Sequence, residues 1–322
     1  MKKTLLALAL LISTCFALPT LTIGVLSYGT VNWELNVLKH HKLDEKNGFN
    51  LKVVKLGSKN ATTIALRGKE VDAIVADWIW ASVERDKKHP YVFYPYSKST
   101  GALYVSKDTK AKDLKDLKGK KIGIAGGPVD KTWLIFRAYT KQKYNLDFKD
   151  IVAPTFASPV ILNKQMSSGK LDGVSNFWHF NAKLKAGGAT RLIGMHEILP
   201  TFGVKGDLPL IGWVFDESFA KKNKKLVNGF LQASFMSKKI LSSDKKEWER
   251  IRPAMKAKDD KVFASLKEGY LAGIPKTFGK QEKKNAKIVF DILVKEGGKK
   301  LVGSSTALNK GTFWDFTPSV SW

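Results

Sequence analysis

The chain has 322 residues, which is enough for two globular domains that each bury a hydrophobic core. Its formal net charge is +26, and lysine supplies most of the positive charge. The lysines are scattered along the chain, so we interpret them as a solvated surface that favours anionic membranes, and we expect no nucleic-acid partner. The one cysteine, Cys15, excludes an intramolecular disulfide.

The first 17 residues have the pattern of a secretory signal peptide: two lysines, an apolar run over residues 5–12, and a small-residue exit that ends at Ala17. The apolar run is too short to span a bilayer. We predict cleavage after Ala17 and export of the mature chain to the periplasm. The alternative is a lipid anchor on Cys15, which Thr14 disfavours because it is a poor residue directly before a lipid-bearing cysteine.

Two parts of the chain, about one hundred residues apart, share a pattern of strands and helices. Residues 68–78 match residues 169–178, and each segment ends on a tryptophan. Shorter matches upstream follow in the same order, which predicts two similarly built lobes. The first lobe is expected to have strands at 21–26, 51–56 and 71–76 and helices at 33–42 and 61–66. The second is expected to have strands at 121–125, 151–156 and 171–175 and helices at 133–143 and 160–166.

Alternating strands and helices predict an α/β fold with parallel sheets that are covered on both faces. Residues 101–106 and 211–215 are expected to be strands that cross between the lobes at a hinge. Four helices follow, at 222–241, 244–255, 258–271 and 281–296, and we assign this tail to the first lobe. The predicted boundaries are 1–17 for the signal peptide, 18–102 plus 213–322 for the first lobe, and 103–212 for the second.

Ligands in such folds bind beyond the carboxyl ends of the strands, where loops lead into helix N-termini that attract anions. Asp77 can accept a hydrogen bond from an ammonium or a ring N–H, and Lys131 can balance the charge of an acid. At least two of the four tryptophans at matched strand ends are expected to line the cleft. The candidates are Tyr28, Thr30, Trp33, Ser58, Asp77 and Trp78 on one wall and Lys131, Trp133, Ser158, Asn176, Trp178 and His179 on the other.

Each type of candidate also has a structural interpretation. Ser58 and Ser158 fit helix N-caps, and any single tryptophan fits a hydrophobic core. Asp77 fits a helix cap, and Lys131 fits a solvated lysine at the start of a helix. The pattern of residues does not choose between these interpretations and ligand contact.

No catalytic motif is present in the sequence. It lacks a Gly-x-Ser-x-Gly elbow, a His-Glu-x-x-His motif and a P-loop, and its five histidines lack metal-ligand spacing. We therefore expect a binding protein rather than an enzyme, with no cofactor and no metal.

Residues 23–33, 66–72 and 113–123 and the joint at Leu171 and Asp172 carry a family resemblance, and the DLKGKKIG stretch at 116–123 is its most specific part. These segments resemble the ABC-transporter periplasmic binding proteins of the nitrate, sulfonate and taurine type, which are related to thiamine-precursor binding proteins. The resemblance covers essentially the whole mature chain. It implies a two-lobed type II periplasmic-binding-protein fold with two crossover strands at the hinge.

The resemblance also implies a monomeric solute-binding component of an ABC importer, which captures a small organic solute, such as a sulfonate or taurine, and delivers it to a membrane permease. The aromatic residues and Asp77 disfavour nitrate. Two alternatives stay open: a heterocyclic or cationic solute such as a thiamine-pyrimidine precursor, and a subunit that presents its ligand to a membrane sensor. The cysteine-rich motif of the thiamine-pyrimidine synthases is absent.

Overall fold

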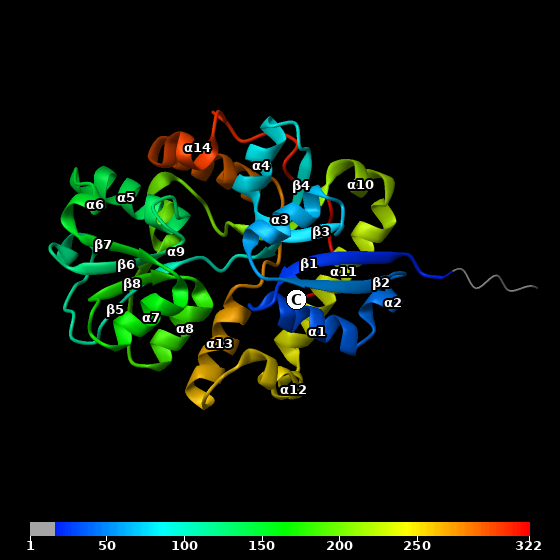
Figure 1. Cartoon of the computed structure of the whole chain (residues 1–322), viewed down its shortest axis with the longest axis horizontal. Helices are drawn as coiled ribbons and strands as arrows, with labels where there is room; N and C mark the ends of the chain where they lie inside the picture. The colour runs from blue at the N-terminus through cyan, green and yellow to red at the C-terminus, as the bar shows by residue number, and fades with distance from the viewer. Residues whose placement is uncertain (1–16) are drawn as a thin grey trace, which may run out of the picture.

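Two five-stranded sheets, each covered by helices, form the centres of two lobes (Figure 1). The computed structural model describes residues 17–322, so residues 1–16 of the predicted signal peptide lie outside it. The first sheet contains β1 (Thr20–Leu26), β2 (Asn50–Leu56), β3 (Ala73–Asp77), β4 (Tyr91–Ser97) and β10 (Ile211–Asp216), in the order β2-β1-β3-β10-β4. The second contains β5 (Ala102–Val105), β6 (Lys121–Ala125), β7 (Ala153–Ala157), β8 (Gly173–Asn176) and β9 (Thr190–Gly194), in the order β7-β6-β8-β5-β9.

Both sheets are mixed, whereas the sequence analysis expected parallel sheets. In the first, β10 runs antiparallel to its neighbours β3 and β4. In the second, β5 runs antiparallel to its neighbours β8 and β9. Both reversed strands are the first to follow a crossing between the lobes, and each inserts into the middle of the sheet that it enters. The two-lobed α/β class is therefore confirmed with its two crossovers, and the lobe boundaries stay a prediction.

The repeat in the sequence corresponds to a repeated unit in the structure. β1 pairs in parallel with β2 and β3, and β6 pairs in parallel with β7 and β8. The matched aspartates have the same role in both units. The carboxylate of Asp72 accepts from the Thr22 N–H at 2.7 Å, and that of Asp172 accepts from the Lys121 N–H at 2.8 Å. Each aspartate thus ties the third strand to the start of the first.

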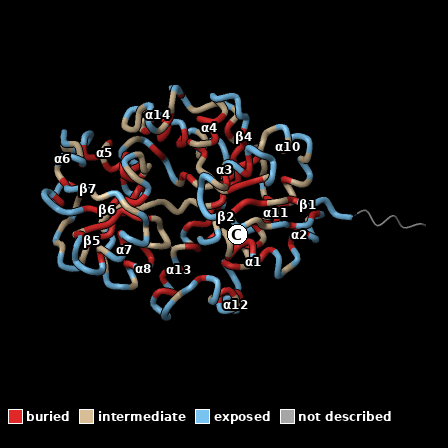
Figure 2. The backbone as a smooth tube through the Cα atoms, viewed as in Figure 1, coloured by how far each residue is buried: buried red, intermediate tan, exposed pale blue. Residues whose placement is uncertain are grey.

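Helices cover the sheets, and Figure 2 shows that buried residues follow the strands while exposed residues lie on the outer loops and helix faces. In the first lobe they are α1 (Val31–His40), α2 (Leu43–Lys46), α3 (Lys59–Arg67) and α4 (Trp78–Asp86). In the second they are α5 (Lys131–Tyr144), α6 (Phe148–Ile151), α7 (Pro159–Ser167), α8 (Trp178–Ala186) and α9 (Met195–Ile198), with 3₁₀ turns at Leu114–Leu117 and Leu199–Phe202. The tail forms α10 (Glu217–Lys222), α11 (Lys224–Ser243), α12 (Lys245–Met255), α13 (Asp260–Ala272) and α14 (Lys280–Val302). Among residues 17–322, none of these helices has both the length and the apolar character needed to cross a bilayer.

The C-terminal helices contact both lobes, although the sequence analysis assigned the whole tail to the first. α13 packs against α8, and α14 packs against α4 and α5 (Figure 1). One buried cluster joins Trp78 of the first lobe, Phe290 of α14 and Leu134 of the second lobe. The tail therefore forms part of the boundary between the lobes.

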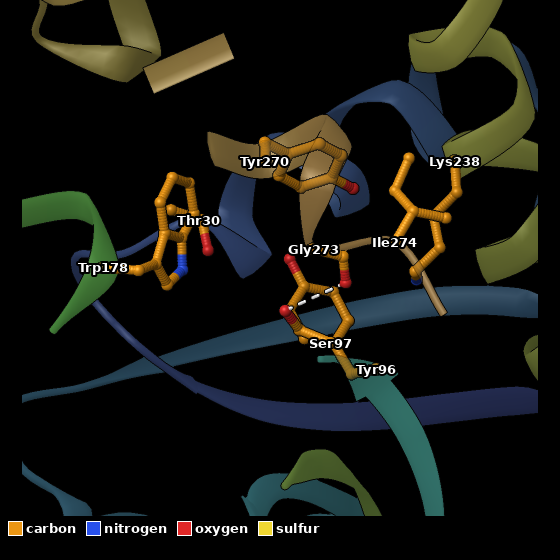
Figure 3. Close-up of a pocket in the computed structure, with 8 residues that line it drawn as sticks. All are labelled: Thr30, Tyr96, Ser97, Trp178, Lys238, Tyr270, Gly273 and Ile274. Carbon is orange, nitrogen blue, oxygen red and sulfur yellow. Dashed lines mark hydrogen bonds between the residues drawn. The ribbon is translucent and has the colours of Figure 1, made fainter. Parts of the chain in front are cut away.

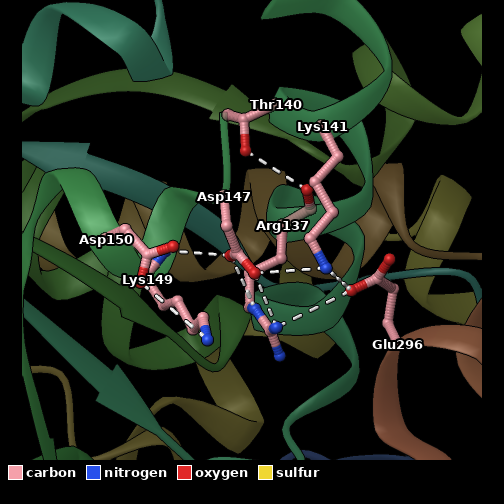
Figure 4. A network of polar contacts seen from close by, with 7 residues as sticks. All are labelled: Arg137, Thr140, Lys141, Asp147, Lys149, Asp150 and Glu296. Carbon is pink, nitrogen blue, oxygen red and sulfur yellow. Dashed lines mark hydrogen bonds and ion pairs between the residues drawn. The ribbon is translucent and has the colours of Figure 1, made fainter. Parts of the chain in front are cut away.

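A charged network holds α14 against the second lobe (Figure 4). Arg137 donates to both carboxylate oxygens of Asp147 at 2.8 Å. Lys141, one turn further along α5, donates to Glu296 of α14 at 2.6 Å and lies 3.1 Å from Asp147. Because the side chains of Asp147 and Glu296 are almost fully buried, this network is screened less than a surface ion pair.

Candidate functional site

A pair of opposite charges joins the two lobes. Asp77 is the last residue of β3 and caps α4, accepting from the Trp80 N–H at 2.9 Å. Lys131 is the first residue of α5 in the other lobe, and its Nζ lies 3.0 Å from Asp77 Oδ2. The side chains are 17% and 28% exposed, respectively. The sequence analysis predicted that both face a ligand cleft; the structure places them in contact between the lobes, and their contact with a ligand stays a prediction.

Further charges surround this pair. Burial alone would raise the pKa of Asp77, but Lys131 outweighs it and holds that pKa below its ordinary value. Burial would lower the pKa of Lys131, and Asp77 reverses this and raises it. Burial raises the pKa of Asp130, the N-cap of α5, against the opposing effects of Lys131 and Lys59. Two carboxylates and two lysines therefore influence one another at this contact between the lobes.

Beside this charged region lies a narrow cavity of about 10 Å³, which is room for about one water molecule (Figure 3). All but one of its lining residues come from the first lobe and the tail, and Trp178 comes from the start of α8 in the second lobe. The lining residues are Thr30, Tyr96, Ser97, Trp178, Lys238, Tyr270, Gly273 and Ile274. A solute that entered here would contact both lobes.

A buried polar network forms one side of this cavity. The carboxylate of Glu34 is fully buried and accepts from Lys238 Nζ at 2.5 Å, from Tyr270 Oη at 3.0 Å and from the Ser234 hydroxyl. The ammonium of Lys238 also lies 4.5 Å from the centre of the Tyr96 ring. Because Glu34 and Lys238 are both buried, removing either of them would leave the charge of the other uncompensated in the core.

The hydroxyl of Tyr96 makes no hydrogen bond to any described residue, although the residue is only 4% exposed. Burial raises its pKa well above the ordinary value, and the Glu34 carboxylate adds to the effect. The hydroxyl therefore keeps its proton. The hydroxyls of Thr30 and Tyr270 lie close to it without a well-directed hydrogen bond, so an acceptor atom of a ligand could compete with them for its proton.

Aromatic rings from both lobes meet at this cavity. Trp33 of α1 lies edge to face with Trp178, with ring centroids 6.2 Å apart, and its centroid is 6.1 Å from that of Tyr270. Gly269 of α13 makes room for Trp178, since a Cβ at this position would come within 2.8 Å of the indole. Three of the residues predicted from the sequence, Thr30, Trp33 and Trp178, therefore lie close together at the boundary between the lobes.

Two of the predicted tryptophans do not face the cleft. Trp78 is fully buried, donates its indole N–H to the Pro209 carbonyl at 3.1 Å and packs near Phe290. Trp133 is buried against Phe148, with ring centroids 5.3 Å apart. Both rings thus match the core packing that the sequence left open for any single tryptophan. A side chain in the first turn of a helix can point to the cleft or into the core, and here burial of the large apolar ring decides for the core.

The predicted polar residues mostly have structural roles. Ser58 is exposed and accepts from the Ala61 N–H at 3.1 Å, as an N-cap does, and Ser158 is an exposed N-cap residue whose side chain makes no capping bond. The side-chain NH₂ group of Asn176 donates to the Pro159 carbonyl and to the side-chain oxygen of Asn163, both in the second lobe. Ser58 and Asn176 thus have the structural roles that the sequence left open for them, and ligand contact by either residue stays a prediction.

Tyr28 and His179 remain at the periphery of the site. Tyr28 is 56% exposed. His179 lies against Trp178, with ring centroids 5.8 Å apart, and burial together with the charge of Lys183 lowers its pKa to about 4. Its imidazole is therefore neutral at neutral pH and can donate or accept one hydrogen bond.

The sequence analysis did not include several residues of the cavity. The sequence could have identified Lys238, because this lysine lies on the apolar face of its helix together with Val227, Phe230 and Leu231. A lysine on such a face needs a buried partner. Tyr96 and Tyr270 gave no comparable signal, since a tyrosine in a strand or a helix is most often part of the core.

Comparison with known proteins identifies the fold. Residues 92–244 match the family model described as NMT1/THI5 like, and no curated protein sequence matches the chain. The periplasmic aliphatic sulphonate-binding protein SsuA from Escherichia coli aligns with a TM-score of 0.72 and 18% identity over 94% of each chain. The alkanesulfonate-binding protein SsuA from Xanthomonas axonopodis, bound to MOPS, aligns with a TM-score of 0.66 and 14% identity over 92% of this chain and 99% of its own.

The periplasmic nitrate-binding protein NrtA from Synechocystis is a more distant neighbour, with a TM-score of 0.55 and 14% identity over 79% of this chain and 69% of its own. At such identities these likenesses show the fold and not the solute. The chain has the two-lobed fold of periplasmic binding proteins.

Proposed function

We propose that this chain, which has the fold of periplasmic solute-binding proteins, is the solute-binding component of an ABC importer. It captures a small organic solute of the sulfonate or taurine type between its lobes and delivers it to a membrane permease, without catalysing a reaction. The observation that carries the proposal is the contact between Lys131 and Asp77 across the cleft.

The paired charges favour a solute that carries both signs of charge. Asp77 and Lys131 neutralise each other at 3.0 Å. A solute with an acidic end at Lys131 and an ammonium or N–H group at Asp77 can separate the pair and still leave both charges compensated. An inorganic anion would satisfy Lys131 alone and leave Asp77 buried without a partner. This reasoning favours a taurine-like solute over nitrate.

Isothermal titration calorimetry of the mature chain in a sulfonate-free buffer tests the proposal. Taurine and MOPS carry both signs of charge, ethanesulfonate keeps the sulfonate without an ammonium, and nitrate is the inorganic control. We expect taurine or MOPS to bind at least about tenfold more tightly than ethanesulfonate, since a charged hydrogen bond contributes roughly 1.5–3 kcal/mol. Nitrate binding as tight as that of the best sulfonate, or no binding by any sulfonate, would overturn it.

A heterocyclic or cationic solute is the second candidate, and the aromatic cavity is the observation that favours it. Trp178 and Tyr270 offer ring faces, and the free Tyr96 hydroxyl offers a donor to a ring nitrogen. Two substitutions separate the candidates. A larger loss of affinity with Lys131→Ala indicates an acid such as a sulfonate, and a larger loss with Asp77→Ala indicates a cationic or N–H-bearing heterocycle.

We also propose export to the periplasm and a monomeric state. The support for export is the signal-peptide pattern in residues 1–17 and the periplasmic location named for the similar structures. N-terminal sequencing of the mature protein should begin at or near Leu18. An N-terminus blocked by a lipid on Cys15 would show an anchored protein instead.

A further inference from the structure

Three side chains that could hold a metal come together at the end of α1 that lies away from the cavity. They are His40 and His41, at the C-terminus of α1, and Glu247, in the first turn of α12. One ligand atom from each lies within 4.8 Å of the other two. Within residues 17–322 this is the one cluster of this kind. The ten residues of α1 separate it from the cavity by about 15 Å.

The carboxylate of Glu247 is bonded by Arg250, whereas no well-directed hydrogen bond uses the Nε2 atom of His41. His41 Nε2 lies 3.3 Å from Glu247 Oε1 but is buried without a properly directed hydrogen bond. His40 is exposed, and its ring is perpendicular to that of His41 with centroids 5.0 Å apart. A buried ring nitrogen without a well-directed hydrogen bond is uncommon, and its lone pair is available to a metal ion.

We infer that His40, His41 and Glu247 bind one divalent zinc ion. Two imidazole nitrogens and one carboxylate oxygen are a ligand set that zinc accepts, and water can complete a tetrahedron. Zinc bonds of about 2.0–2.2 Å place the ligand atoms roughly 3.4 Å apart, so the three atoms need to move together by about an ångström. The exposed ring of His40 can make this movement by rotating its side chain.

The surroundings of the cluster suit a cation held by Glu247. Arg250 donates to both oxygens of Glu247, at 3.0 and 2.6 Å, which fixes the orientation of the carboxylate as an outer-shell partner does. The C-terminal carbonyls of α1 present the negative end of the helix dipole to the two histidines. Imidazole ligands select zinc over magnesium and calcium, which prefer all-oxygen sites.

A bound zinc ion would link α1 to α12 at the outer end of the first lobe. The inner end of α1 carries Trp33 and Glu34, which contact Trp178 and Lys238 of the cavity wall. The ion would therefore hold in place the helix that positions these residues. The sequence analysis expected no metal because the histidines have no ligand spacing among themselves, and the third ligand is distant in sequence.

Calorimetric titration of zinc chloride into the EDTA-treated, untagged mature chain tests the inference, with magnesium chloride as the control ion. We expect one zinc per chain, no binding of magnesium, and a zinc-dependent rise in melting temperature. His40→Ala, His41→Ala and Glu247→Gln should each weaken zinc binding at least about tenfold. His196→Ala is the matched control, because this histidine is exposed and outside the cluster, and should bind zinc as the wild type does.

Absence of a one-to-one zinc complex, or unchanged zinc affinity in the three cluster variants, would overturn the inference. If Glu247→Gln does not fold because Arg250 loses its partner, His40→Ala decides, since its exposed side chain can be removed without a cavity. Solute binding in the presence of EDTA should be unaffected by His40→Ala, so the test does not depend on the proposed transport function.

Discussion

Replacing Asp77 by asparagine should favour the open form of the solute-free protein. The substitution keeps the shape of the side chain but removes the negative charge that lies 3.0 Å from Lys131 Nζ in the other lobe. Lys131 then gains from moving into water, because in the closed form its ammonium is mostly buried and has lost its main counter-charge. Separation of the lobes provides that exposure.

The expected size of the effect follows from the geometry of the pair. A hydrogen bond between charged groups contributes about 1.5–3 kcal/mol, and the partial exposure of both side chains argues against a larger value. The ratio of open to closed molecules should therefore rise about ten- to a hundredfold. Small-angle X-ray scattering of the solute-free protein should show a larger radius of gyration for Asp77→Asn than for the wild type.

A double-mutant cycle and a matched control make the test specific. Lys131→Met removes the partner charge at similar volume, and the double variant should recover part of the loss because no charge is left unpaired. Lys185→Met is the control, since Lys185 pairs with Glu268 between α8 and α13 but the two side chains are 48% and 66% exposed. Superimposable scattering profiles for Asp77→Asn and the wild type, together with a coupling energy near zero, would refute the reasoning.

Three further predictions concern single side chains. Trp178→Ala should weaken solute binding at least about tenfold with little change in melting temperature. Trp78→Ala should instead destabilise the fold by about 3–5 kcal/mol in urea unfolding. The reverse pattern would contradict the placement of both rings. Burial would raise the pKa of Asp147, but Arg137 lowers it to about 2 from 3.8. Asp147 should therefore contribute about 2 kcal/mol of stability above pH 4 that is lost as the pH falls towards 2, so the difference between wild type and Asp147→Asn should shrink from pH 5 to pH 3, and a constant difference would contradict this. The imidazole of His179 should titrate with a midpoint near pH 4 by NMR, and a midpoint near 6.5 would show a solvated ring.

The elements that the sequence predicted well are those with a strong local pattern. Short β-rich runs and the joints between strands and helices recur at a near-constant offset, and Asp72 and Asp172 show why the offset is kept, since each bonds the start of the central strand. The direction of β5 and β10 has no local pattern. It depends on how the chain re-enters a sheet after crossing between lobes, so the expectation of parallel sheets was wrong.

The site also contains one part that the sequence predicted and one part that it did not. Asp77 ends the third strand of the first lobe, and Lys131 opens the helix that follows the first strand of the second, so the order of strands and helices was enough to place both at the boundary between the lobes. The cavity depends on contacts between distant parts of the chain: Lys238 reaches Glu34 across 204 residues, and Tyr270 reaches it across 236. No local sequence pattern predicts which face of a C-terminal helix will pack against α1.

The tail also determines how the lobes can separate. Its two contacts with the second lobe lie on opposite sides of the molecule, α14 against α5 and α13 against α8 (Figure 1). The contact of α14 includes the buried carboxylate of Glu296, and breaking it would leave a charge without a partner. The contact of α13 consists of apolar packing, with Trp178 and Ala182 of α8 against Leu266 and Tyr270, and of the exposed pair of Lys185 and Glu268, so that separating it leaves no buried charge unpaired. We therefore expect opening to separate α13 from α8 while α14 stays in place, so that Trp178 leaves Trp33 and the cavity opens to solvent first.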